Sequence, residues 1–220
     1  MSYARDIIAF DMDGVLVDSK KSIIKSLNVA LLELGFKPVK ISRQDLIGMA
    51  IREMLLAATN NQIRPEQLKP AIARYRAANN KLGPQHTAPY KGILVVLQKL
   101  SEKFDLIVIT SKLQSSATEL LQGLKIDQHF IGIFGPEIDG ISESKEATLS
   151  RAVSLLSRET GKKVTIRALV GDRATDVIAA KKFGVQSVAA LWGYGTKSEL
   201  GESDAKARKP HQLITLFNHY

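Results

Sequence analysis

The sequence predicts an α/β protein whose core is a doubly wound parallel sheet, with a helical module inserted after the first strand. Short apolar runs alternate with helical patterns through the second half of the chain, which is typical of parallel βαβ units with right-handed crossovers. Between the first strand and that half, the pattern is helical and carries no strand signal. We therefore assign residues 1–15 and 91–220 to the core and residues 16–90 to the helical module.

The first half of the helical module is predicted to hold three helices. A long helix follows Ser19, a residue type that caps helices, and ends at Gly35. Ser42 is placed to cap a short helix that Gly48 interrupts. A further helix is expected over residues 50–58.

The second half of the module contains residues that break helices. Pro65 suits a first helical turn, but Pro70 predicts a break before another helix at residues 72–78. Residues 79–89 are polar and rich in breakers, so we expect a linker there.

The core is predicted to begin with an apolar strand and to resume near Gly92. Each later strand is a short apolar run, and the helices between them carry apolar residues at helical spacing. The expected strands are residues 7–10, 106–109, 130–134, 164–170 and 187–191, and the expected helices are residues 94–100, 115–123, 145–156 and 175–183.

Composition limits the class of protein. A chain of 220 residues with 45% apolar residues can bury a substantial core. No apolar run approaches the roughly 20 residues that cross a bilayer, and the N-terminus lacks the apolar region of a signal peptide. There is no cysteine, which fits a reducing compartment. We therefore expect a cytoplasmic protein with no membrane partner.

The formal net charge of +9 raises the hypothesis of nucleic-acid binding. However, no basic run is interleaved with aromatic residues and no nucleic-acid motif is present, so this partner is disfavoured. Attraction of small anionic substrates, or a solvated basic surface, explains the charge better. The pattern leaves monomer and homodimer equally open.

Two carboxylates follow the first strand directly. Asp11 and Asp13 lie one residue apart at its predicted carboxyl end, and Gly14 then allows a tight turn. Ligands of open α/β sheets bind at this edge, and Mg²⁺ suits carboxylate oxygens together with a substrate phosphate. Asp11 is thus a candidate nucleophile or metal ligand, and Asp13 is its candidate acid/base partner. A polar strand exit with an Asp-Gly turn is the alternative interpretation.

Three further groups of polar residues are expected at the same edge. Thr110 and Ser111 follow the strand at 106–109, Lys145 begins a helix after a loop, and Asp172 and Asp176 follow the strand at 164–170. These residues supply a hydroxyl, a backbone N–H, a positive charge and further carboxylates, which phosphoryl transfer needs. Asp176 can orient Lys145 or hold a metal-bound water. Singly, each group could be a helix cap or a surface charge.

With these four motifs the chain resembles the haloacid dehalogenase-like hydrolase superfamily, in the subgroup with a helical cap after the first strand. The motifs are residues 11–19, residues 107–111, Lys145 and residues 171–176. Residues 89–92 and 193–195 are similar to the phosphoglycolate phosphatase-like branch. The resemblance implies a Rossmann-like core with an inserted cap domain.

The resemblance also implies a mechanism. Asp11 would attack phosphorus and form an aspartyl-phosphate, and Asp13 would protonate the leaving oxygen and then activate water. Mg²⁺ would be held by Asp11, Asp172 and the backbone carbonyl of Asp13. Because members that dehalogenate lack the acid at the position of Asp13, dehalogenation is disfavoured.

Two positions depart from the branch or leave a choice open. Glu146, and not proline, follows Lys145, so Lys112 is the alternative phosphate contact. Arg173 is placed either to reach substrate or to form a salt bridge within the core.

The resemblance implies that the cap sets specificity. Gly48 and Arg52 lie at a break between cap helices. Arg52 is a candidate for binding a substrate carboxylate or a second anionic group, although an exposed helix arginine is the simpler interpretation.

The sequence therefore predicts a Mg²⁺-dependent phosphatase acting on a small phosphorylated metabolite, similar to phosphoglycolate phosphatase. A phosphosugar mutase and a nucleotide monophosphatase are the enzyme alternatives. A phospho-accepting signalling module is the non-enzyme alternative, but the acid at Asp13 argues against it, because a module that stores phosphate should not hasten its hydrolysis. A nucleic-acid-binding protein on a decayed core would have lost a motif carboxylate, and none is missing.

Overall fold

The computed structural model describes residues 5–137 and 143–218 and contains the predicted parallel sheet. Six strands lie in the order β5-β4-β1-β6-β7-β8, and every pair is parallel. The strands are β1 (Ile7–Phe10), β4 (Asp105–Ile109), β5 (Gly132–Phe134), β6 (Ile166–Gly171), β7 (Gln186–Ala190) and β8 (Ala205–Ala207). The predicted fold class, an α/β protein with a helical insertion, is confirmed.

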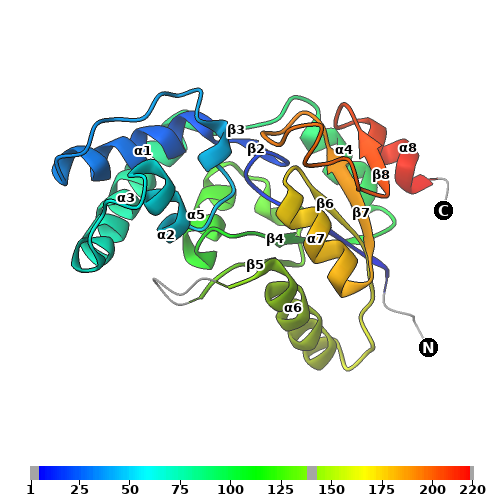
Figure 1. Ribbon diagram of the computed structural model, residues 1–220. Coiled ribbons are helices and arrows are strands. Elements are labelled where there is room, and N and C mark those ends of the chain that lie inside the picture. The colour runs from blue at the N-terminus through cyan, green and yellow to red at the C-terminus, as the bar shows by residue number, and fades with distance from the viewer. Residues whose placement is uncertain (1–4, 138–142, 219–220) are drawn as a thin grey trace.

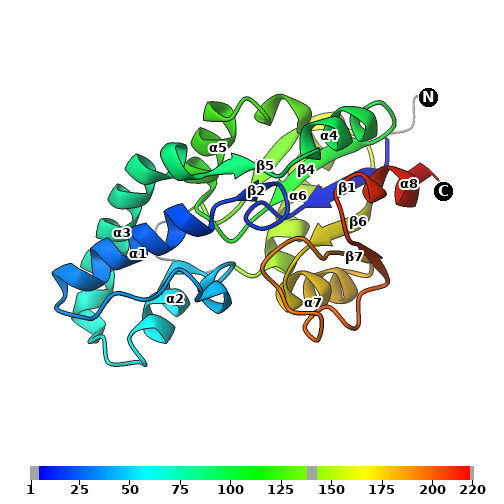
Figure 2. The same cartoon turned by 90° about the horizontal axis from the view of Figure 1, so that it is seen from above.

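Helices cover both faces of the sheet, because the side chains of a strand alternate between its faces. Ile8 and Phe10 of β1 pack with α4 (Ile93–Ser101), α5 (Gln114–Gly123) and α8 (Gln212–Asn218). Ile7 and Ala9 pack with α6 (Lys145–Thr160) and α7 (Ala174–Phe183) on the other face. Figure 2 shows α4 and α7 on opposite sides of the sheet. The central strand is therefore buried on both faces, and its carboxyl end is held rigidly.

The insertion is formed by α1 (Lys20–Glu33), the 3-10 helix η1 (Gln44–Leu46), α2 (Ile51–Ala58) and α3 (Pro65–His86), which gather at one end of the molecule in Figures 1 and 2. It has its own apolar cluster, centred on Leu27, Leu31 and Leu55. The chain enters and leaves it through an antiparallel pair, β2 (Val17–Asp18) with β3 (Ala88–Pro89). Within the described parts of the chain, no helix combines the length and apolar character needed to cross a bilayer.

The predicted end of the insertion is wrong in one respect. A single helix, α3, runs from Pro65 to His86, through Pro70 and through residues 79–86 of the expected linker at residues 79–89. Pro70 removes one backbone hydrogen bond, but Ile72, Tyr75 and other residues of α3 are buried, and α3 packs along α1. Tertiary burial therefore maintains the helix where local propensity predicts a break.

The short helix expected after Ser42 is also different in detail. It is a 3-10 turn at Gln44–Leu46 whose N-cap is Arg43, with no side-chain cap hydrogen bond. Ser19 does precede α1, and it makes no side-chain cap hydrogen bond to that helix. Its hydroxyl instead donates to Asp13, so this serine serves the site.

Candidate active site

Asp11 and Asp13 leave the carboxyl end of β1, the central strand. Gly14 has a φ of +96°, which side-chain-bearing residues rarely adopt, and its N–H donates to the carbonyl of Val17 at 2.9 Å. This turn brings back Ser19, whose hydroxyl donates to Asp13 Oδ1 at 2.5 Å. Both carboxylates are buried and both line one cavity.

Lys145 begins α6 and points its ammonium group into the carboxylates. Its Nζ lies 2.8 Å from Asp11 Oδ1 and also forms an ion pair with Asp176 Oδ1. The side chain is only 5% exposed, which excludes the surface-lysine interpretation. The structure thus brings together three residues that are more than 30 positions apart in sequence.

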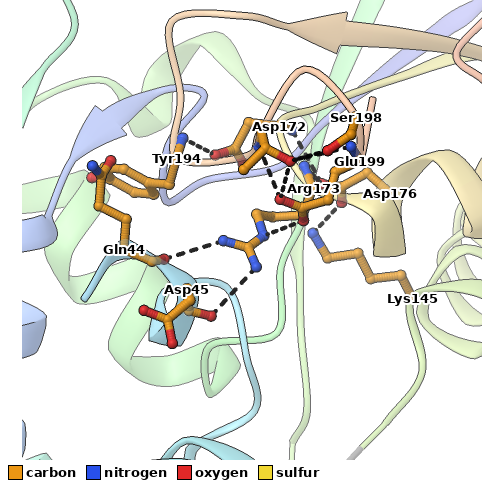
Figure 3. A network of polar contacts seen from close by, with 10 residues as sticks. Gln44, Asp45, Lys145, Asp172, Arg173, Asp176, Tyr194, Ser198 and Glu199 are labelled. Carbon is orange, nitrogen blue, oxygen red and sulfur yellow. Dashed lines mark hydrogen bonds and ion pairs between the residues drawn. The ribbon is translucent and has the colours of Figure 1, made fainter. Parts of the chain in front are cut away.

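Asp172 and Asp176 follow β6, the neighbour of β1. Asp176 Oδ2 accepts hydrogen bonds from the backbone N–H groups of Asp172 and Arg173 at 3.1 and 3.0 Å, which fixes the start of α7. Asp172 Oδ2 accepts a hydrogen bond from the N–H of Tyr194 at 2.6 Å (Figure 3). Asp172 Oδ1 is buried and has no hydrogen-bond partner among the residues that the structure describes. That oxygen is available as a ligand.

The electrostatics of the site favour a further cation. Burial raises the pKa of Asp11 to about 7; Lys145 opposes this shift, but Asp176 and Asp13 add to it. Burial, Asp11 and Asp176 also raise the pKa of Asp172. Burial alone would lower the pKa of Lys145, but the charges of Asp11 and Asp176 outweigh it and raise the pKa. The pKa values of the two aspartates thus rise mainly because the carboxylates are buried, whereas that of Lys145 rises because carboxylates surround it.

A divalent cation fits this arrangement. Ligand oxygens of Asp11, Asp172 and Asp176 all lie within 4.8 Å of one another, and all three residues are buried. When its four carboxylates are all ionised, the site faces two ammonium groups, those of Lys112 and Lys145, which leaves a formal surplus of two negative charges. Together with the unpartnered oxygen of Asp172, this surplus makes the cluster compatible with a divalent metal site.

Thr110, Ser111 and Lys112 follow β4, on the other side of β1, and line the same cavity. Thr110 Oγ1 accepts a hydrogen bond from the N–H of Lys112 at 3.1 Å. Lys112 Nζ lies 3.6 Å from Asp13 Oδ2 and donates to Asn79 Oδ1 at 3.4 Å. Both lysines considered from the sequence therefore reach the carboxylates, Lys145 at Asp11 and Lys112 at Asp13.

The cavity encloses about 70 Å³ between the sheet edge and the insertion. Gly48 lines it, and a Cβ at this position would lie 3.1 Å from Arg173 Cγ, so the loop approaches the core closely here. Arg52 is exposed and is not among the described residues that line the cavity. The structure therefore brings Gly48 to the site and leaves Arg52 outside it.

Arg173 connects the core to the insertion. Its Nε forms an ion pair with Glu199 at 3.2 Å, and its Nη atoms donate to the backbone carbonyls of Gln44 and Asp45 at 3.1 and 3.4 Å (Figure 3). The salt bridge considered from the sequence is present. The contacts with Gln44 and Asp45 were not anticipated, because they depend on how η1 docks.

Two further residues at this site could not be identified from the sequence pattern. The Tyr194 hydroxyl accepts hydrogen bonds from the N–H groups of Ser19 and Lys20 at 2.8 and 3.1 Å and donates to Asp18 Oδ1 at 2.9 Å, so it anchors the entry to the insertion. Asn79 is buried beside Lys112 in what was expected to be a linker. The spacing of buried residues along α3 is the signal that could have found it.

Comparisons with known proteins agree with this geometry. The chain matches the family model described as haloacid dehalogenase-like hydrolase over residues 8–190. It is 28% identical to a phosphoglycolate phosphatase of Aquifex aeolicus over 218 residues, 97% of either chain. It is 32% identical over 191 residues to the tyrosine-protein kinase PtkA of Mycobacterium tuberculosis, covering 86% of this chain and 63% of that one. The crystal structure of a predicted phosphatase from Clostridium acetobutylicum superposes with a TM-score of 0.87 and 25% identity, covering 99% of this chain and 100% of that one.

Fold and site together define an α/β enzyme whose buried aspartates gather at the carboxyl edge of a parallel sheet. The chain belongs to the haloacid dehalogenase-like hydrolase family, as the resemblance of its four motifs indicated. The chain is thus a hydrolase of this family, and phosphatases are among its relatives.

Proposed function

We propose that this enzyme is a Mg²⁺-dependent phosphatase that hydrolyses a small phosphomonoester through an aspartyl-phosphate on Asp11. The observation that carries the proposal is the pair Asp11 and Asp13 on the wall of one cavity, with the buried cluster of Asp11, Asp172 and Asp176 beside it. We further propose that residues 16–90 act as the cap that closes this cavity.

Mg²⁺ would be held by Asp11, Asp172 and the backbone carbonyl of Asp13, with Asp176 supporting them through Lys145 and the backbone. When bound, it would neutralise charge on the phosphoryl oxygens. The unpartnered Asp172 Oδ1 and the surplus of negative charge support this donor set. Hard oxygen ligands favour Mg²⁺ over softer metals.

In the reaction itself, Asp11 is the nucleophile and Asp13 is the general acid and then the general base. The Asp11 carboxylate attacks phosphorus, and the bond to the leaving oxygen breaks as the new P–O bond forms. Asp13 gives its proton to that alkoxide, which is a poor leaving group without it. Asp13 then takes a proton from the water that attacks phosphorus, which releases phosphate and restores Asp11. The hydrogen bond from Ser19 to Asp13 Oδ1 leaves the other oxygen, Oδ2, to face the cavity side and Lys112.

The remaining polar residues would bind the phosphoryl group. Thr110 offers its hydroxyl and Ser111 its backbone N–H, while Lys145 and Lys112 supply positive charge. Lys145 is held by Asp11 and Asp176, so its charge is fixed in place before substrate arrives. Such preorganisation lowers the barrier to reaction because no reorganisation is needed in the transition state.

The size of the cavity favours a small leaving group. Pockets for drug-sized ligands measure about 300–1,000 Å³, whereas this cavity encloses about 70 Å³. A phosphosugar mutase would use Asp11 in the same way, so it is separated from the phosphatase only by the fate of the phosphoryl group.

The test is phosphate release from a panel of small phosphomonoesters, with Mg²⁺ and with chelator, for the wild type and for Asp11→Asn. Because the nucleophile is lost, we expect Mg²⁺-dependent turnover to fall by at least about 10³-fold in the variant. Asp6→Asn is the matched control, since Asp6 precedes the other end of β1 and its exposed side chain pairs with Arg167. Isomerisation of a sugar phosphate without phosphate release would instead identify a mutase.

A further inference from the structure

The loop after β7, residues 192–195, packs directly against Asp172. A Cβ on Gly193 would overlap the Asp172 side chain, and a Cβ on Gly195 would overlap its backbone carbonyl. Only glycine allows two backbone segments to approach this closely. Between the two glycines, the N–H of Tyr194 donates to Asp172 Oδ2 at 2.6 Å (Figure 3). The loop therefore holds the carboxylate of a proposed Mg²⁺ ligand from one side.

The side chain of Tyr194 packs with the insertion, although the residue belongs to the core. It is 7% exposed and, within the described parts of the chain, is the one buried member of the insertion's apolar cluster that comes from outside residues 16–90. Its hydroxyl makes the hydrogen bonds described above with Asp18, Ser19 and Lys20, where β2 leads into α1. Burial raises the pKa of this phenol, so the hydroxyl stays protonated and remains a donor. The backbone and the side chain of one residue thus contact the two parts of the chain.

Ser19 extends this connection to the candidate acid/base residue. Its N–H donates to the Tyr194 hydroxyl at 2.8 Å, and its own hydroxyl donates to Asp13 Oδ1 at 2.5 Å. Together with the hydrogen bond from Tyr194 to Asp172, these contacts run from the core through the first residues of the insertion to Asp13, and all of them are buried. Buried networks of this kind are rigid, so a change at one end alters the freedom of the other.

Asp172 lies among like charges. Burial, Asp11 and Asp176 raise its pKa, and its Oδ1 has no hydrogen-bond partner among the described residues. A divalent cation bound there would offset the repulsion and restrict the carboxylate. Because the N–H of Tyr194 donates to the other oxygen of that carboxylate, the loop would lose freedom with it. When two binding or docking events share the same ordering, each one favours the other.

We propose that Tyr194 is a positioning residue that couples cation binding at Asp172 to the placement of the insertion. Cation binding in the core then orders β2 and the start of α1, and an ordered insertion in turn raises the affinity for the cation. The phenol oxygen carries this coupling, because it is the atom that bonds to the entry of the insertion. This inference rests on the metal site of the proposed function and adds the regulation of that site.

Tyr194→Phe isolates the phenol oxygen. Phenylalanine keeps the ring in the apolar cluster and keeps the backbone N–H on Asp172, so the hydrogen bonds to the entry of the insertion are what is lost. The matched control is Tyr75→Phe, since Tyr75 of α3 is the other buried tyrosine of the described cluster. Each variant removes one phenol oxygen from the same cluster, but only Tyr194→Phe removes it from the entry to the insertion.

Hydrogen exchange in the absence of substrate measures the coupling. The reporter is the N–H of Ile23, which donates to the carbonyl of Ser19 at 3.0 Å and not to the phenol. At saturating Mg²⁺, we expect exchange at Ile23 to be at least about threefold slower than in chelator for the wild type and for Tyr75→Phe, and to change less than about 1.5-fold for Tyr194→Phe. A Mg²⁺ effect of the same size in all three proteins, or in none of them, would overturn the coupling.

Calorimetric titration with Mg²⁺ tests the reciprocal effect and separates this inference from the proposed function. We expect Tyr194→Phe to bind Mg²⁺ about 5- to 20-fold more weakly than the wild type, and Tyr75→Phe to stay within about twofold of it. If both effects of Tyr194→Phe appear but the wild type hydrolyses no phosphomonoester, the phosphatase assignment fails and the coupling stands. If the wild type releases phosphate but Tyr194→Phe keeps the wild-type affinity for Mg²⁺, the coupling is wrong and the phosphatase assignment stands.

Discussion

The ammonium group of Lys145 lies between two carboxylates, 2.8 Å from Asp11 and in contact with Asp176. Lys145 is thus the buried cation that contacts the candidate nucleophile Asp11, and Lys112 forms an ion pair with Asp13. The site still carries more negative than positive charge, which is the condition under which a bound divalent cation stabilises the fold. Individual side chains thus link the stability of this protein to its metal.

Lys145→Met should make that link measurable. Removing the ammonium group leaves buried carboxylates without their cation, which typically costs about 3–5 kcal/mol. Urea unfolding in chelator should show a loss of this size, and added Mg²⁺ should recover part of it. The control is Lys99→Met, since Lys99 is exposed and pairs with Glu102. Equal stability of Lys145→Met and wild type in chelator would contradict the electrostatic account.

The sequence predicted the cluster of Asp11, Asp13, Thr110 and Asp172 because their positions follow from strands alone. Parallel strands end at a common edge, so residues just beyond them meet wherever the order of strands permits. Tyr194 and Asn79 could not be placed in this way. Their contacts depend on how a long loop and the insertion dock against the core, and no local pattern encodes that docking.

At the scale of elements, the loop that begins α7 and the turn η1 hold the two parts of the chain together. Arg173 donates from the core to the carbonyls of Gln44 and Asp45, and Asp176 fixes the backbone of Arg173. Because Asp172 is the adjacent residue, the attachment of the insertion lies one residue from a candidate metal ligand.

Arg173→Ala should loosen η1 without unfolding it. The side chain provides two hydrogen bonds to this turn, so we expect faster hydrogen exchange at the N–H groups of Leu46 and Ile47, which bond to carbonyls within the turn. Arg43→Ala is the control, since Arg43 bonds through its exposed side chain to the side chain of Asp45. Unchanged exchange in Arg173→Ala, or an equal change in both variants, would show that Arg173 does not hold the turn.

Three strands that the sequence does not predict share a physical cause. β8 has three residues, Ala205–Ala207, and β2 and β3 have two each, so none offers a pattern long enough to recognise. The opposite error occurred at α3, where Pro70 and the polar residues after it predicted a break. There the burial of one helix face outweighs local propensity, and only the tertiary structure reveals it.

At the scale of the whole molecule, β8 is attached to the sheet by its backbone pairing with β7 and also by hydrogen bonds to a charged side chain. Asp204, just before β8, accepts hydrogen bonds at one oxygen from the N–H and hydroxyl of Ser187 in β7, at 2.8 and 2.6 Å. These hydrogen bonds lower the pKa of Asp204 below its ordinary value of 3.8. A carboxylate with a lowered pKa stabilises the folded state above its unfolded pKa, and this stabilisation is lost as pH falls through the folded pKa.

Asp204→Ala should therefore destabilise the protein in a pH-dependent way. We expect a loss of at most about 1 kcal/mol at pH 6, because Asp204 is exposed and solvent screens it. The loss should be smaller in acid, once the wild-type carboxylate begins to take up its proton. Urea unfolding of both proteins at pH 6 and near pH 3 measures the difference. A loss that stayed the same at both pH values would show that the charge of Asp204 contributes nothing.

The fold places the residues of the proposed mechanism around Asp11, and direct detection of the aspartyl-phosphate tests that mechanism most sharply. Asp13→Asn should be mixed with 4-nitrophenyl phosphate, whose leaving group needs no proton, quenched in acid and digested for mass spectrometry. We predict a phosphoryl group on Asp11 that hydroxylamine removes and that the additional substitution Asp11→Asn abolishes. Release of 4-nitrophenol and phosphate at steady state with no phosphoryl group on Asp11, or with one on another residue, would contradict the account.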